Sequence, residues 1–324
     1  MDRTAPILRI EKISLQDGAG LRTVVFFKGC PLRCAWCSTP ESQDARPERY
    51  YQQGKCTLCE RCVQACPAQA LSIPAGGGAI VWDTEKCTRC FRCVAACPAK
   101  ATQIYGVNMT VKDVMRHIHR DEVFYFHSGG GVTLSGGDVL CYPEFARDLL
   151  AECKAAAIHT AAELTMYGDY KRIAMLFPLL DSALIDLKLM DAEQHRRWTE
   201  KDNEGILANI RRASGDFGTV PMHMRVPLIE GVNDDEENLT QTAAFCAELP
   251  SCETLEFLPY HRLGQETYRY LGRTYTLHDL PAMTPQAAQE RIACLTGRTW
   301  PFQIKISGEP AGKAAAPPIP AAPG

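Results

Sequence analysis

The stretch Lys28–Ser42, KGCPLRCAWCSTPES, holds three cysteines, Cys30, Cys34 and Cys37, in the spacing C-x3-C-x2-C. A closed structural metal site usually takes four protein ligands, whereas a catalytic site keeps one position open. Three thiolates on a [4Fe–4S] cluster would leave one iron free for an external ligand. The loop alone also allows a zinc site with a distant fourth ligand, or a surface redox loop.

Eight further cysteines lie in an internal repeat. KCTLCERCVQACPAQALSI begins at Lys55, and KCTRCFRCVAACPAKATQI begins at Lys86. Each half reads C-x2-C-x2-C-x3-C-P, the bacterial ferredoxin run in which the fourth cysteine reaches the other [4Fe–4S] cluster. The spacing therefore predicts two ligand sets: Cys56, Cys59, Cys62 and Cys97, and Cys87, Cys90, Cys93 and Cys66. A pair of zinc sites is the alternative, although zinc ribbons usually show paired C-x2-C knuckles. The two clusters would carry electrons or serve a structural role.

The chain divides into four parts. Residues 1–49 contain the apolar strand TVVFFKGC and the three-cysteine loop, and residues 50–105 form the cysteine-dense insert. Strand and helix patterns alternate over 106–308, which predicts a parallel sheet, a barrel or part of one, with its site at the carboxyl ends of the strands. Asp234 followed by Glu237 predicts a helix start. Residues 309–324 are rich in Ala and Pro, and we expect a disordered tail.

Composition narrows the function. The formal net charge of −3 argues against a protein that neutralises many nucleic-acid phosphates. We find no apolar run near the ~18 residues that a membrane span needs, and no signal peptide. We therefore expect a cytoplasmic protein that binds neither nucleic acid nor a membrane. In that reducing compartment, sixteen cysteines favour metal ligands over disulfides.

The motif CPLRCAWC resembles the cluster loop of the radical S-adenosylmethionine (SAM) superfamily. Its neighbours QDGAGLRTVVFFKGC and STPES, and then SGGGVTLSGGD, IHTAAE, DLKLMDAEQH, RVPLIEGVND and LPYHRLG, resemble the activating enzymes of glycyl radical enzymes. The resemblance runs from about residue 10 to 306, and the two-cluster insert is typical of the larger members. It implies an α/β fold, a partial (β/α) barrel of the radical SAM type with an inserted ferredoxin-like α+β domain.

The resemblance also implies the reaction. SAM would be cleaved reductively to methionine and a 5′-deoxyadenosyl radical, which takes hydrogen from the Cα of a glycine on a partner glycyl radical enzyme. Three [4Fe–4S] clusters, a flavodoxin or ferredoxin as electron donor, and a monomer are expected. Candidate partners act on choline, glycerol or diols, hydroxyphenylacetate, sulfonates or hydrocarbons. The alternatives are a radical SAM enzyme for a small molecule and a multi-cluster electron-transfer protein.

Two motifs correspond to SAM-binding positions of the family. Gly136, Gly137 and Asp138 match a Gly-Gly-acid motif, whose glycines let the backbone approach SAM and whose acid, usually Glu, faces its ammonium. Asp186 and Lys188 match the D-x-K motif, which makes Lys188 a partner for the methionyl carboxylate. Taken without the resemblance, the first motif could be a glycine-rich turn and the second a surface ion pair.

Three more positions follow from the resemblance. Glu163 matches an acid near the ribose or near a bound monovalent cation, and Arg225 and His261 match residues that line the SAM pocket. The residue after that acid is often Thr in the family, but here it is Leu164, with Thr165 one place on. This departure bears on the cation site.

Overall fold

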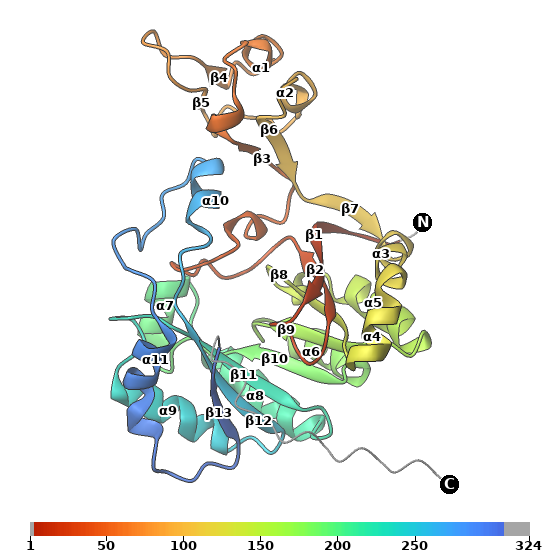
Figure 1. Ribbon diagram of the computed structural model, residues 1–324, viewed down its shortest axis with the longest axis vertical. Helices are drawn as coiled ribbons and strands as arrows, with labels where there is room; N and C mark the ends of the chain where they lie inside the picture. Colours follow the sequence, from red (N-terminus) through yellow and green to blue (C-terminus); the bar gives the residue numbers. More distant parts are fainter. Residues whose placement is uncertain (1–2, 308–324) are drawn as a thin grey trace.

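The computed structural model describes residues 3–307, so the tail expected at 309–324 lies outside the described residues. A nine-stranded sheet forms the body, and Figure 1 shows helices around it and a smaller lobe above it. From β2 to β13 all neighbouring strands are parallel, which confirms the expected parallel α/β sheet. The sequence pattern did not reveal β1 and β7. β1 pairs antiparallel with β2, and the edge strand β7 pairs antiparallel with β1.

In spatial order the strands of this sheet are β13 (Gln303–Ile306), β12 (Cys252–Pro259), β11 (Met222–Leu228), β10 (Ser182–Asp186), β9 (His159–Leu164), β8 (Gly131–Gly136), β2 (Arg22–Phe27), β1 (Thr4–Ser14) and β7 (Val107–Thr110). The α-helices of the body are α3 (Val111–Ile118), α4 (Glu122–Ser128), α5 (Pro143–Ala155), α6 (Tyr170–Leu176), α7 (Ala192–Thr199), α8 (Glu204–Asp216), α9 (Glu236–Ala247), α10 (Gln265–Tyr270) and α11 (Pro285–Arg291). Short 3-10 turns are η1 (Pro40–Ser42), η2 (Gln53–Lys55), η3 (His119–Asp121), η4 (Val139–Cys141), η5 (Phe177–Leu179) and η6 (Ile292–Leu295).

The cysteine-rich segment forms the lobe, which is joined to the body through a pair of strands. These strands, β3 (Glu48–Tyr51) and β6 (Thr102–Tyr105), are antiparallel. Beyond them lie α1 (Arg61–Gln64), α2 (Arg92–Ala95) and a second antiparallel pair, β4 (Leu71–Ser72) with β5 (Val81–Trp82). Figure 1 shows α10 between the lobe and the body. The ring centroids of Tyr50 on β3 and Tyr270 on α10 are 6.4 Å apart.

The start of α9 differs from the sequence prediction by one residue. Asp235, not Asp234, is the N-cap, and its carboxylate accepts a hydrogen bond from the Asn238 N–H at 2.9 Å. Asp234 instead accepts one from the Gly231 N–H and pairs with Arg291 at 2.8 Å. Either aspartate suits a helix start, but Asp234 is engaged in the ion pair with Arg291, so Asp235 caps the helix. Within residues 3–307, no helix is both long and apolar enough to cross a membrane.

Candidate active site

The three-cysteine loop leaves the carboxyl end of β2 and is fastened by its backbone. The Gly29 N–H donates to the Ser42 carbonyl at 2.5 Å, which closes the loop on itself. The N–H groups of Arg33 and Ala35 donate to the carbonyls of Thr199 and Trp198, at 2.9 and 3.0 Å. The last turn of α7 therefore holds the loop over the ends of the parallel strands.

A cavity of about 440 Å³ opens beside the loop. The carboxyl ends of β8, β9, β10, β11 and β12 form its floor, which is where a parallel α/β sheet places its ligands. Nine of the expected site residues line it: Cys30, Cys34, Cys37, Gly136, Gly137, Glu163, Asp186, Lys188 and His261. We call this space the central cavity. Asp138 and Arg225 are not among its lining residues.

The surrounding protein desolvates the three loop thiols. Burial raises the pKa of all three, that of Cys34 to about 12, while Lys188 acts against this shift at Cys34 and Cys37. A thiolate is the form that binds metal. Ionised thiolates in these desolvated surroundings thus need a bound cation or cationic cluster iron, and the donor set fits an iron–sulfur cluster.

The two glycines of the Gly-Gly-acid motif have a structural reason to be glycine. Gly136 has φ +113°, and a Cβ there would lie 2.3 Å from the Phe27 nitrogen. A Cβ on Gly137 would lie 2.1 Å from the Gly29 carbonyl oxygen. The close approach is therefore to the backbone of β2 and the cysteine loop. It brings the cavity floor against the cluster loop.

Asp138 is buried in the wall beside the central cavity. It is 1 % exposed, and its carboxylate accepts hydrogen bonds from the Leu140 N–H at 3.0 Å and from the Thr165 hydroxyl. These bonds cap η4 and tie it to the residue after β9. Burial raises the pKa of Asp138 to about 6, although both hydrogen bonds and Lys188 lower it. The carboxylate points into the wall because the short Asp side chain accepts hydrogen bonds from the following turn and from Thr165.

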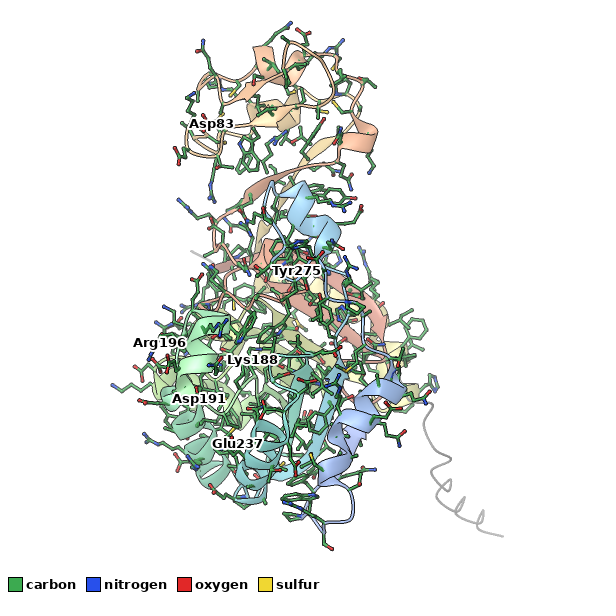
Figure 2. All side chains as sticks on the ribbon, turned by 90° about the vertical axis from the view of Figure 1, so that its left-hand side faces the viewer. Asp83, Lys188, Asp191, Arg196, Glu237 and Tyr275 are labelled. Carbon is green, nitrogen blue, oxygen red and sulfur yellow. The ribbon has the colours of Figure 1, made fainter. Side chains whose placement is uncertain are left out.

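Asp186 and Lys188 form an ion pair at the end of β10. The Lys188 ammonium donates to the Asp186 carboxylate at 2.7 Å, and Lys188 is 8 % exposed. Burial opposes the charge on Lys188, but Asp186, Cys34 and Cys30 outweigh it and raise its pKa. Lys188 is therefore a permanent cation in the central cavity, and the pair is not a surface one. Figure 2 shows Lys188 inside the body, far below Asp83 of the lobe.

Glu163 and Arg225 are coupled across β9 and β11. The Arg225 guanidinium lies 3.4 Å from Glu163 and 3.3 Å from Glu256, and it also donates to the Gln16 carbonyl. Burial and the nearby Asp186 raise the pKa of Glu163, while Arg225 and the Ser135 hydroxyl lower it. Glu163 faces the cavity, and Arg225 stands behind it.

The remaining positions lie at the two sides of the cavity. His261 is an exposed residue at the rim, and partial desolvation of its ring lowers its pKa. Leu164 is buried, and its apolar side chain offers no oxygen to a cation. The Thr165 hydroxyl, one residue on, donates to Asp138.

Two small cavities in the lobe divide the repeat cysteines crosswise. Cys56, Cys59, Cys62 and Cys97 line one, which we call the Cys62 cavity. Cys66, Cys87, Cys90 and Cys93 line the other, the Cys93 cavity. These are the two sets that the ferredoxin spacing predicts. Backbone N–H groups lower the pKa of Cys59 and Cys90, which favours their thiolates. Among residues 3–307, no three His, Cys, Asp or Glu side chains gather closely enough for a single metal ion.

Comparison with known proteins places this geometry in a family. A family model described as a 4Fe-4S dicluster domain matches residues 48–98. The (2S)-3-sulfopropanediol sulfolyase activating enzyme of Bilophila wadsworthia is 41% identical over 86% of this chain and 93% of its own. The isethionate sulfite-lyase activating enzyme of Nitratidesulfovibrio vulgaris is 41% identical over 83% of this chain and 88% of its own. The chain belongs to the activating enzymes of glycyl radical enzymes.

A solved structure agrees with this activating enzyme in fold alone. Streptococcus suis SuiB, crystallised with its precursor peptide SuiA, has a TM-score of 0.53 and 13% sequence identity. The match covers 88% of this chain and 48% of that one. The activating enzyme is an oxidoreductase of the radical SAM superfamily with an α/β fold and a dicluster domain.

Sequence reasoning missed several residues of the activating enzyme that hold the strands and side chains around the site together. Ser135, on β8, donates to Glu163, and Gln16 accepts from Arg225. Arg22 is wholly buried and donates to the Thr133 hydroxyl and the Val132 carbonyl, both at 2.6 Å. The motif QDGAGLRT carried this signal, since Gln16 and Arg22 belong to it, but their partners lie more than a hundred residues away.

Proposed function

We propose that the central cavity holds SAM beside a [4Fe–4S] cluster bound by Cys30, Cys34 and Cys37. One observation carries the proposal: these three thiols share a single cavity with the buried Lys188 cation and the Glu163 carboxylate. Three cysteine ligands leave one iron for the amine and carboxylate of SAM. A pure electron carrier has no use for such a cavity.

When bound, the cluster supplies the electron for cleavage of a carbon–sulfur bond of SAM. One electron and one SAM give methionine and a 5′-deoxyadenosyl radical. The radical takes a hydrogen atom from a glycine Cα of the partner enzyme, which leaves 5′-deoxyadenosine and a glycyl radical. The chain's own residues bind SAM, orient it and exclude water from the cavity.

The cavity side chains suit the parts of SAM. Lys188 offers its ammonium to the methionyl carboxylate, and Asp186 keeps that ammonium charged and in place. Glu163 offers its carboxylate to ribose hydroxyls, with Ser135 and Arg225 fixing its orientation. His261 and Leu263 stand at the mouth, and Leu263 is 80 % exposed, so the partner's glycine loop would enter past them.

The finer architecture belongs to the same proposal. The body, residues 1–49 and 106–308, is a partial (β/α) barrel of the radical SAM type, and residues 50–105 are a ferredoxin-like insert with two [4Fe–4S] clusters. A flavodoxin or ferredoxin supplies electrons to a cytoplasmic, monomeric enzyme. The crosswise cysteine cavities support the insert clusters. The Leu164 side chain offers a monovalent cation no oxygen, so any cation near Glu163 would depend on backbone carbonyls or other side chains.

Iron content and SAM cleavage test the proposal. Anaerobically reconstituted protein should hold about 12 iron atoms, from three four-iron clusters, and form 5′-deoxyadenosine and methionine with SAM and dithionite. Cys34→Ala should hold about four fewer and form neither product, while Cys153→Ala, a buried cysteine far from the cavity lining, should match wild type. Full iron without SAM cleavage would overturn the proposal.

The partner is identified by a glycyl radical signal. Candidate glycyl radical enzymes acting on sulfonates, choline, diols, hydroxyphenylacetate or hydrocarbons are mixed with the reduced protein and SAM. The true partner should give a glycyl radical in electron paramagnetic resonance (EPR) spectra. SAM cleavage without a radical on any candidate, together with turnover of a small molecule, would support the small-molecule alternative.

A further inference from the structure

Arg49 is a buried cation in the wall of the Cys93 cavity. It is 2 % exposed, and none of its three guanidinium nitrogens has a hydrogen-bond partner among residues 3–307. The guanidinium lies 5.0 Å from the ring centroid of Trp82 and 5.4 Å from that of Tyr51. Burying a charge without acceptors is costly. The acceptors must therefore come from what the cavity holds.

Two other donors in this wall are also without acceptors. The Trp82 Nε1 and the Arg89 Nη1 are buried and have no hydrogen-bond partner in the described part of the chain. The sulfides and thiolates of an iron–sulfur cluster are acceptors and carry negative charge. A wall that offers unpaired N–H donors beside four cysteines fits such a group.

The internal repeat supplies a matched comparison. Ile80 stands 31 residues after Arg49, which is the offset between the two cysteine runs. Ile80 is 6 % exposed and lies in the wall of the Cys62 cavity. The two equivalent positions therefore cover different cavities, one with a guanidinium and the other with an alkyl side chain. The Cys62 cavity is lined by Glu60 and has no Arg or Lys in its wall.

We propose that Arg49 raises the reduction potential of the cluster in the Cys93 cavity above that of the cluster in the Cys62 cavity. This inference rests on the proposed cluster ligation. Reduction adds one electron, and so one negative charge, to a cluster; a buried cation and hydrogen bonds to sulfur stabilise the reduced form. Arg49 lines the Cys93 cavity and is not among the residues that line the Cys62 cavity. A single electron entering the lobe thus resides on the Cys93 side.

EPR-monitored redox titration of the full chain tests this tuning. In a background with Cys30, Cys34 and Cys37 all changed to Ala, about eight iron atoms should remain, from two four-iron clusters. Titration with dithionite should give two different one-electron midpoint potentials. Arg49→Ile should lower the higher of the two midpoint potentials by at least about 59 mV, which is a tenfold shift of that cluster's one-electron reduction equilibrium. Ile80→Arg should raise the lower midpoint potential. Each variant installs the residue found at the equivalent position of the other half of the repeat.

The controls separate tuning from folding and from ligation. Arg49→Lys keeps the charge but loses the planar fork, and should shift the higher potential less than Arg49→Ile does. Lys100→Gln removes an exposed charge of the lobe and installs the residue found at the equivalent Gln69, so both potentials should stay. If Arg49→Ile keeps eight iron atoms and its potentials are unchanged, the inference is overturned. If Arg49→Ile loses iron, Ile80→Arg becomes the test, and unchanged potentials in that variant would overturn the inference. Far fewer than eight iron atoms in the background protein would instead overturn the proposed ligation.

Discussion

Asp138 is one methylene shorter than the Glu that the resemblance leads us to expect at this position. The family motif usually places Glu at this position, and a longer side chain would reach farther from the same backbone. The shorter Asp caps η4 through the Leu140 N–H and accepts from Thr165, both inside the wall. We therefore propose that Asp138 positions the cavity floor, with direct binding of SAM as the alternative.

Two substitutions of Asp138 separate positioning from direct binding. Asp138→Asn keeps the acceptor for Leu140 and should leave the dissociation constant of SAM within about threefold of wild type. Asp138→Ala loses both hydrogen bonds and should weaken binding about tenfold, roughly 1.4 kcal/mol. Isothermal titration calorimetry on reconstituted protein measures both. If Asn weakens binding as much as Ala, the carboxylate charge acts on SAM, as the family motif implies.

Arg225 sets the pH range in which Glu163 is ionised. Burial and Asp186 raise the pKa of Glu163, and Arg225 lowers it. Arg225→Gln removes that opposing charge, so the pKa rises further and the carboxylate becomes protonated at a higher pH. The acid limb of SAM binding should move up by about one pH unit or more.

The measurement is the dissociation constant of SAM across pH 5–9. Arg212→Gln, on the exposed face of α8, removes an equal charge outside the central cavity and should leave the profile in place. An Arg225→Gln profile that coincides with wild type would mean that ionised Glu163 does not contribute to SAM binding.

At the scale of elements, the lobe is anchored by a buried ion network. Lys28, just before the cysteine loop, is fully buried and donates to Glu48 on β3 at 3.0 Å. Arg273, after α10, donates to the same carboxylate at 2.6 Å and to the Pro40 carbonyl at 2.8 Å. Burial lowers the pKa of Lys28, while Glu48 raises it. Glu48 thus compensates two cations where the lobe, the loop and α10 meet.

Glu48→Gln should destabilise the protein strongly. The substitution keeps the shape but leaves the buried Lys28 without its counter-charge, which costs about 3–5 kcal/mol. Denaturant unfolding followed by circular dichroism measures the change. Glu248→Gln breaks the Arg211 pair, in which both side chains are about half exposed, and should cost below about 1 kcal/mol. Equal small losses in both variants would show that the network does not anchor the lobe.

At the scale of the whole molecule, the three cysteine sites are separate. No residue of the central cavity also lines the Cys62 or the Cys93 cavity. The lobe stands away from the sheet and is joined to it through β3 and β6 (Figure 1). Loss of a cluster in the lobe should therefore spare the central site.

Cys59→Ala tests this separation. The variant should lose about four iron atoms, one four-iron cluster, yet bind SAM with an unchanged dissociation constant, because Cys59 is exposed on the lobe. Iron analysis and calorimetry measure both quantities, with Cys34→Ala as the reverse case. Loss of SAM binding in Cys59→Ala would show that the sites depend on one another.

Much of this protein could be predicted from its sequence because short-range spacing carries the chemistry. The loop cysteines are four and three residues apart, and the repeat divides its eight cysteines into the two sets that line the lobe cavities. Alternating strand and helix patterns likewise predicted β8 to β12. The antiparallel strands β1 and β7 were not predicted, since β1 is buried only over residues 5–7 and β7 has no buried residue, so neither shows a long apolar pattern.

Tertiary structure alone decided which way the side chains turn. Asp138 faces its own turn because Thr165, 27 residues on, meets it there, and Asp234 is taken by Arg291 rather than by its helix. Likewise, no sequence pattern singled out Arg49 and Ile80, and only the fold places them in the walls of different cavities. The sequence determined the ligands, whose spacing is local. The surroundings that set charge and orientation came from contacts between residues far apart in the chain.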